Sequence, residues 1–149
     1  KLRTDPKKAK HLSPTSTSLK DQVMWMKSYK TRTDQAYFII ENKNNEMLGC
    51  IRMYNPSRDS FEWGSWLIVS GALPFVALES ALSMYSYAKR LGFRQAKVDV
   101  RQENINVWKF HENMFDAVLI KQDEFNRYYQ IDQKMIDLNL ERYKSLLYA

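Results

Sequence analysis

Residues Ser60–Phe115 read SFEWGSWLIVSGALPFVALESALSMYSYAKRLGFRQAKVDVRQENINVWKFHENMF, and this stretch decides the fold of the chain. Its apolar periodicity predicts, in order, a strand over Phe61–Val69, a helix over Phe75–Leu91, a strand over Gln95–Arg101 and a helix over Asn104–Asn113. A strand that enters a helix through a short loop directs unpaired backbone N–H groups and the positive end of the helix dipole at one point. We therefore expect one wall of a cleft for a phosphorylated ligand here, with the second strand and helix as the other wall.

The loop between the first strand and its helix, Ser70–Pro74, is the first candidate site. Gly71 permits a positive φ or the close approach of a ligand, and Pro74 is favoured in the first turn of a helix. Two interpretations stay open from these residues. The loop is either a pyrophosphate cradle of backbone amides or a tight strand-to-helix connection without a ligand.

The sequence on either side of this stretch predicts further strands and helices. Before it we expect a helix over Leu19–Tyr29 and a hairpin of strands Ala36–Glu41 and Met47–Tyr54. After it we expect strands over Ala117–Lys121 and Arg127–Ile131, then an amphipathic helix marked by Ile136, Leu140, Tyr143 and Leu147. Strands mixed with helices in this order predict a single α/β (α+β) domain over residues 1–149.

Composition limits the class of protein. The chain has 149 residues, of which 44% are apolar and 13% aromatic, enough for one hydrophobic core and too many for a disordered chain. No apolar run has the length of a membrane span, and no signal-peptide pattern opens the chain. The single cysteine, Cys50, excludes a disulfide framework, so we expect a reducing, cytoplasmic setting and no membrane partner.

The formal net charge is +6, and many of the lysines and arginines lie in the first thirty-two residues. Such a charge is compatible with nucleic acid, an anionic membrane surface or an anionic small molecule. No nucleic-acid-binding motif accompanies it, so we expect no nucleic-acid partner and rank a basic RNA-associated domain lowest. A solvated basic face and a field that attracts phosphate-bearing ligands remain.

The second candidate site is the helix that begins near Asn104, which can cap it. His111 lies seven residues further on, hence on almost the same helical face, so it is expected to look into the cleft that Asn104 borders. A histidine has the pKa range to donate or accept a proton near neutrality. The alternative is a lone surface or core histidine without a chemical role.

The third candidate site is the strand segment Phe61–Trp66. Glu62 is a carboxylate among aromatic residues, where partial desolvation would raise its pKa and suit it to take a proton from an ammonium group. The competing interpretation is that Glu62 points to solvent or pairs with Arg52 on the neighbouring strand. Gly64 is expected to allow a bulge that separates this strand from the next and opens the cleft.

Asn104, Val107 and His111 match the pattern of Asn, a small residue three positions on and Tyr or His seven positions on. In this, and in its order of strands and helices, the chain resembles the GNAT (GCN5-related) N-acetyltransferases. The family's Gln/Arg-x-x-Gly-x-Gly/Ala phosphate motif falls on residues 72–77, where only Ala77 conforms, and Phe115-Asp116 stand in place of the family's Gly-Phe. The resemblance extends over nearly the whole chain, and the likeness of Leu2–Pro6 to the segment after the family's first strand implies a truncated N-terminal strand.

The resemblance implies a mostly antiparallel central sheet flanked by helices, with a splayed strand pair that forms the coenzyme A cleft. It implies acetyl-CoA as co-substrate, no metal, and direct attack by an amine in a ternary complex without an acyl-enzyme. Glu62 would accept the amine proton, the Leu67–Val69 backbone would pair with the pantetheine arm and polarise the thioester carbonyl, and His111 would protonate the departing thiolate. Cys50 has no neighbouring base in the sequence and is not expected to act as a nucleophile. The cofactor-binding residues implied are Leu67, Ile68, Val69, Gly71, Ala72, Leu73, Phe75, Val76, Ala77, Asn104, Val107 and Trp108.

The acceptor side is less well defined. Trp25, Tyr37, Arg52 and Tyr54 are candidate contacts for an amine acceptor, although core and rim packing would explain them equally. Asp99 and Arg101 either line the acceptor side or pair with each other, and we favour the pairing.

The sequences of two segments, Phe61–Leu67 and Val98–His111, resemble those of RimJ/RimL-like GNAT proteins. They also resemble GNAT proteins of surface-polysaccharide and amino-sugar synthesis. This similarity implies a small-molecule amine acceptor, first of all an amino group on a nucleotide-linked sugar, with a protein N-terminus or a polyamine as alternatives. A different class also stays open, a non-catalytic GNAT-like module that binds a ligand or a protein. Exposed aromatic residues and the last helix are compatible with a homodimer.

Overall fold

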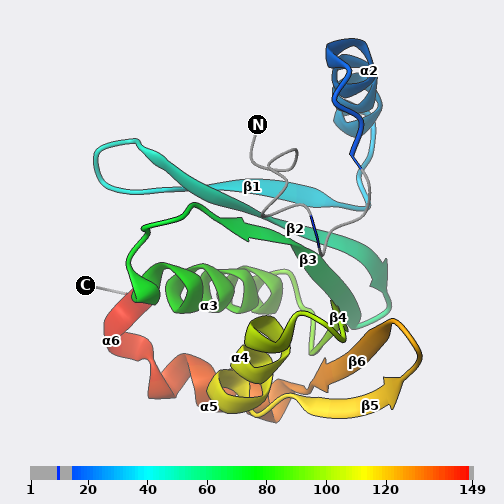
Figure 1. Cartoon of the computed structure of the whole chain (residues 1–149). Helices are drawn as coiled ribbons and strands as arrows, with labels where there is room; N and C mark the ends of the chain where they lie inside the picture. Colours follow the sequence, from blue (N-terminus) through cyan, green and yellow to red (C-terminus); the bar gives the residue numbers. More distant parts are fainter. Residues whose placement is uncertain (1–9, 11–14, 148–149) are drawn as a thin grey trace.

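Within the part of the chain that the structure describes, six strands form one sheet in the order β1-β2-β3-β4-β6-β5, and helices lie on both of its faces (Figure 1). The computed structural model describes Lys10 and residues 15–147. The segment Leu2–Pro6, on which the expectation of a truncated first strand depends, lies outside these residues.

Neighbouring strands pair antiparallel except β3 and β4, which are parallel. The expected mixed, mostly antiparallel sheet flanked by helices is therefore confirmed. The strands are β1 (Ala36–Glu41), β2 (Met47–Ser57), β3 (Ser60–Ile68), β4 (Gln95–Arg101), β5 (Val118–Gln122) and β6 (Asn126–Ile131). The helices are α2 (Leu19–Lys30), α3 (Pro74–Arg90), α4 (Ile105–Phe115), α5 (Gln133–Arg142) and α6 (Lys144–Leu147).

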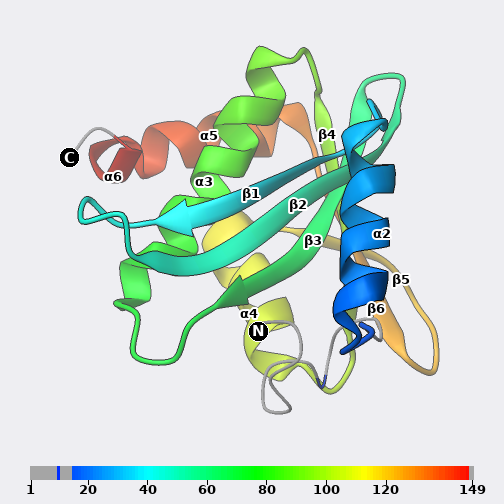
Figure 2. The same cartoon turned by 90° about the horizontal axis from the view of Figure 1, so that it is seen from above.

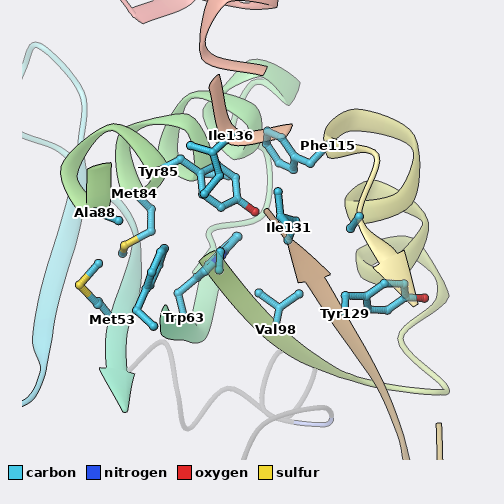
Figure 3. Close-up of a cluster of buried hydrophobic side chains, with 14 of the residues drawn as sticks. Met53, Trp63, Met84, Tyr85, Ala88, Val98, Phe115, Tyr129, Ile131 and Ile136 are labelled. Atoms are coloured by element: carbon cyan, nitrogen blue, oxygen red, sulfur yellow. The ribbon is translucent and has the colours of Figure 1, made fainter. Parts of the chain in front are cut away.

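The hydrophobic core lies between the sheet and the helices α3, α4 and α5 (Figures 1 and 3). Because successive strand residues face opposite sides, Phe61 and Trp63 point into this core and Glu62 between them does not. Trp63 meets the ring of Tyr85 from α3 at 5.7 Å between centroids. The rings of Phe115 and Tyr129 are fully buried in the same cluster.

The other side of the sheet, which we call the outer face, carries Arg52, Tyr54, Glu62 and Asp99 from β2, β3 and β4. Helix α2 stands off this face, near the start of β1 (Figures 1 and 2). No residue of α2 is buried, so the helix is held by few contacts.

The largest differences from the predicted boundaries are in β2 and in the last helix. Strand β2 continues past the predicted end at Tyr54 to Ser57, because a bulge between these residues accommodates Pro56, which has no N–H to donate. The last helix is divided into α5 and α6 at Tyr143, whose φ of −110° departs from helical geometry. Gly92 follows α3 with a φ of +90°, a conformation that glycine adopts without strain at the end of a helix.

Candidate active site

Strands β3 and β4 separate where the sequence predicts a cleft. Their parallel register covers only three pairs, Ser60↔Gln95, Phe61↔Ala96 and Glu62↔Lys97. Both strands then run on, β3 to Ile68 and β4 to Arg101, with no further pairing between them. The splayed strand pair is therefore present, and we call the space between its diverging ends the wedge.

A bulge in β3 lies at the start of the wedge. The register with β2 shifts by one residue between Arg52↔Gly64 and Cys50↔Leu67, and Ser65 adopts a φ of +48°. The expected bulge is therefore present directly after Gly64, and the positive φ belongs to Ser65. Gly64 is needed for another reason, because a Cβ there would lie 3.0 Å from the hydroxyl oxygen of Tyr54.

Cys50 supports this bulge from the neighbouring strand. Its thiol is buried and donates a hydrogen bond to the carbonyl oxygen of Ser65 at 3.6 Å. The hydroxyl of Tyr37 lies 3.5 Å from the same sulfur. A thiol held in this way is in keeping with the expectation that Cys50 is not a nucleophile.

On the helix side of the wedge, aromatic side chains from β3 and α4 are packed together. Trp66 donates its indole N–H to the hydroxyl of Ser80 at 3.1 Å and meets the ring of Phe110 at 5.1 Å. The sequence analysis did not single out Trp66, although it lies in the quoted strand segment. Its position within the bulge, directly after Ser65, re-aims its side chain, and only the structure shows this.

His111 does not look into an open cleft as expected. Its side chain is 2% exposed, and its ring meets the rings of Trp63 and Trp66 at 5.2 and 6.2 Å. Burial lowers the pKa of His111 from 6.5 to about 4, so the imidazole is neutral at pH 7. Its Nδ1 atom has no hydrogen-bond partner among the described residues.

Asn104 occupies the N-cap position of α4, but its side chain makes no capping hydrogen bond. Its carbonyl oxygen instead accepts from the amides of Val107 and Trp108 at 3.1 and 3.2 Å. The Trp108 indole donates to the carbonyl of Gln102, and the guanidinium of Arg127 lies 4.1 Å from the indole ring. The three predicted cofactor residues of this helix therefore form one turn beside the wedge.

The loop before α3 has the features of an anion site. Gly71 has a φ of +85°, and a Cβ there would meet no atom within 4 Å. Four amides donate to no acceptor in the part of the chain that the structure describes, those of Ser70, Gly71, Leu73 and Phe75. Pro74 contributes no N–H, so the loop offers fewer donors than its length suggests.

A groove of about 820 Å³ runs along the other side of α3, toward β1 and the β1–β2 turn. Five predicted cofactor residues line it, namely Gly71, Ala72, Leu73, Phe75 and Val76. Residues of the wedge such as Trp66 and Phe110 do not. The loop thus borders two separate spaces.

On the outer face, polar side chains gather around Tyr54. Its phenol lies over Gly64, and the guanidinium of Arg52 lies 4.9 Å from its ring centroid. Glu62 accepts a hydrogen bond from the Asn55 amide at 3.1 Å and does not pair with Arg52. Sequence reasoning did not find Asn55, which carries no signal of its own in a turn motif.

Two carboxylates act on the Tyr54 phenol. Burial raises the pKa of Tyr54 above its usual value, and the negative charges of Asp99 and then Glu62 raise it further. The favoured pairing of Asp99 with Arg101 is wrong, because no ion pair within 4.0 Å joins these two described residues. Asp99 instead faces Tyr54 and lies across from Tyr128 in the sheet.

Comparison with known proteins identifies the class that this fold and site define. The family model described as acetyltransferase (GNAT) domain matches residues 1–114. The chain therefore belongs to the GNAT acetyltransferase family, whose members use acetyl-CoA, and its activity is the transfer of an acetyl group to an amine.

Individual structures extend this assignment. Apo FdhC, described as a nucleotide-linked sugar GNAT, superposes with a TM-score of 0.87 at 31% identity, over 98% of this chain and 85% of that chain. Campylobacter jejuni N-acetyltransferase PseH in complex with acetyl coenzyme A gives a TM-score of 0.66 at 17% identity, over 76% and 79%. Vibrio cholerae spermidine N-acetyltransferase with CoA and spermine gives 0.70 at 14% identity, over 83% and 80%, so the last two show the fold alone.

A search of curated protein sequences found no significant match. No helix among the described residues is long and apolar enough to cross a membrane. Within the same residues, no three His, Cys, Asp or Glu side chains are grouped so that they could hold a metal ion.

Proposed function

We propose that the acceptor of the acetyl group is the primary amine of a nucleotide-linked amino sugar. The observation that carries this proposal is the cluster of Tyr54, Glu62 and Asp99 on the outer face, at the point where β3 and β4 stop pairing. Two carboxylates there suit an ammonium group, and the 31% identity to a nucleotide-linked sugar GNAT supports the sugar. A chain with one cysteine acting on such a substrate would work in the cytoplasm.

Acetyl-CoA would enter from the opposite side of the wedge. The backbone of Leu67–Val69 would pair with the pantetheine arm as an added strand, and the unpaired amides of the loop before α3 would meet the diphosphate. The turn of α4 with Asn104, Val107 and Trp108 would form the facing wall. The sites for the two substrates would then meet at the bulge of β3.

Transfer would proceed by direct attack. Glu62 would take a proton from the acceptor ammonium, and the free amine would form the new C–N bond to the thioester carbon while strand amides stabilise the oxyanion. The C–S bond breaks, and the proton that the newly acylated nitrogen loses passes to the departing thiolate. We propose that His111 meets the thiolate as a neutral hydrogen-bond donor, since its lowered pKa disfavours the imidazolium form.

An acceptor panel tests the proposed substrate. Release of CoA from acetyl-CoA is measured with a nucleotide-linked amino hexose, spermidine and a peptide with a free N-terminus. We expect the nucleotide-linked amino sugar to have the highest kcat/KM. Preference for spermidine or the peptide would contradict the proposal.

Glu62→Gln tests the proton acceptor in the same assay. The amide cannot take the ammonium proton, so we expect kcat to fall by about 10²-fold to 10⁴-fold. Glu124→Gln removes an exposed carboxylate from the β5–β6 turn and should leave kcat unchanged. Full activity of Glu62→Gln would show that another group accepts the proton.

A further inference from the structure

Three aromatic side chains meet where α2 approaches the outer face. The rings of Trp25 and Tyr29 are stacked at 5.4 Å with an interplanar angle of 13°. Trp25 also meets Tyr37 of β1 edge-on at 5.9 Å, and the Tyr29 hydroxyl accepts the Tyr37 amide hydrogen at 2.8 Å. Trp25 nevertheless keeps 41% of its surface exposed. One face of the indole is covered by Tyr29, and solvent-exposed surface remains for a second planar group.

These rings are aligned with the wedge by the register of the sheet. Tyr37 pairs with Arg52, and Arg52 pairs with Gly64, so the three residues form one row across β1, β2 and β3. With neighbouring strands about 4.8 Å apart, the row spans roughly 10 Å. It leads from the aromatic rings to the glycine beneath the Tyr54 phenol.

Arg52, in the middle of this row, has no carboxylate within ion-pairing distance among the described residues. It donates to the side-chain oxygen of Gln35, and its Nε is buried without an acceptor. The nearby Asp34 carboxylate is instead held by both donors of Arg32, at 2.8 and 2.5 Å. A guanidinium that no carboxylate neutralises is suited to the paired oxygens of a phosphate.

We propose that this row is the nucleotide subsite of the acceptor: the base stacks on the exposed face of Trp25, and Arg52 binds the diphosphate. The amino sugar then reaches the cluster of Tyr54, Glu62 and Asp99. This inference rests on the proposed function and assigns the end of the acceptor that does not react. Helix α2 carries three lysines and one aspartate, a charge that favours a diphosphate and disfavours a polyamine in the same place.

Calorimetric titration with uridine diphosphate and thymidine diphosphate tests the subsite directly. Saturating CoA is present, so that the diphosphate site of the co-substrate is occupied. We expect Trp25→Ala to weaken binding by about 10-fold to 100-fold, the range for loss of one base–aromatic stack. Trp25→Leu, which keeps apolar bulk on α2, should be weakened similarly. Met24→Ala, at a 60% exposed position of the same helix, is the matched control and should bind as the wild type.

Arg52→Lys keeps the positive charge but loses the planar pair of N–H donors that can bind two phosphate oxygens at once. We therefore expect weaker diphosphate binding than in the wild type at every salt concentration. Wild-type affinity in both Trp25 variants, or in Arg52→Lys, would overturn the inference. Thermal melts of each variant identify loss of folding, and a Trp25→Leu variant that melts as the wild type yet binds weakly supports the subsite.

Acetyl-transfer kinetics separate this inference from the proposed function. In Trp25→Leu, the KM for a nucleotide-linked amino sugar should rise about 10-fold or more while the KM for acetyl-CoA stays unchanged. If the wild type transfers acetyl to no nucleotide-linked amino sugar, the proposed function fails. If the wild type does so and Trp25→Leu shows an unchanged KM, the nucleotide subsite alone is wrong.

Discussion

His111 shows how the surroundings of one residue set its chemistry. Its imidazole lies among the rings of Trp63, Trp66 and Tyr129, where there is little water to solvate a positive charge. The unprotonated ring is therefore favoured, and the pKa falls to about 4. A neutral imidazole can donate a hydrogen bond to a departing thiolate, but it has no proton acidic enough to transfer to one.

His111→Phe tests this state through the pH dependence of stability. Between pH 6.5 and 4 the unfolded histidine binds a proton and the folded one does not, so the free energy of unfolding falls as the pH decreases. We expect a loss of about 3 kcal/mol over this range that is attributable to His111. Urea denaturation at several pH values should show that His111→Phe loses correspondingly less stability than the wild type. Parallel pH curves for the two proteins would contradict a buried, neutral histidine.

Helical spacing in the sequence predicts that His111 shares a face of its helix with Asn104. It does not predict how deeply His111 is buried, because Trp63 and Trp66 belong to a strand far away in the chain. The same holds for Tyr54, whose phenol lies over Gly64 of the next strand. Contacts between distant segments depend on register, which a single sequence does not display.

Among the strands and helices, most positions along the chain could be predicted from local sequence patterns. The backbone conformation of the β3 bulge could not. Aromatic and β-branched residues predicted β1 to the residue, and the apolar pattern did the same for β4. A bulge was expected beside Gly64 and is present between Gly64 and Leu67, but its positive φ falls on Ser65, which is not a glycine. The thiol of Cys50 bonds to the Ser65 carbonyl, and such a non-local contact can outweigh a local preference.

The end of α4 is, after Ser65 of β3, a second place where a residue other than glycine adopts a positive φ. Asp116 adopts a φ of +52°, and its carboxylate pairs with Arg142 of α5 at 3.0 Å. Asp116→Ala keeps the strained conformation without the ion pair, whereas Asp116→Gly removes the strain. We expect the alanine variant to be less stable than the glycine variant by about 1–2 kcal/mol in chemical denaturation. Asp116→Asn, which loses only the charge, should lie within about 1 kcal/mol of the wild type. Equal stability of the alanine and glycine variants would contradict strain at this position.

At the scale of the whole molecule, two spaces compete for the coenzyme. The wedge lies between β3 and β4, and the groove of about 820 Å³ lies between α3 and β1. The loop before α3 borders both spaces, so its unpaired amides do not show which of the two binds the coenzyme. We expect the wedge to be the site, because diverging strands leave a backbone edge with which an extended arm can pair.

Hydrogen exchange with and without CoA decides between these two spaces. At a CoA concentration 100-fold above Kd, binding should raise the free energy of unfolding by about 2.7 kcal/mol, and this gain slows exchange wherever only global unfolding exposes an amide. Local protection beyond that gain should appear in peptides covering residues 63–69, because pantetheine would bond to those amides. Peptides covering 38–48, which line only the groove, should show no additional local protection, and the β5–β6 hairpin serves as the internal reference. Protection concentrated on residues 38–48 would place the coenzyme in the groove. The acetyl group would then not be delivered at the bulge of β3, beneath Tyr54 and Glu62.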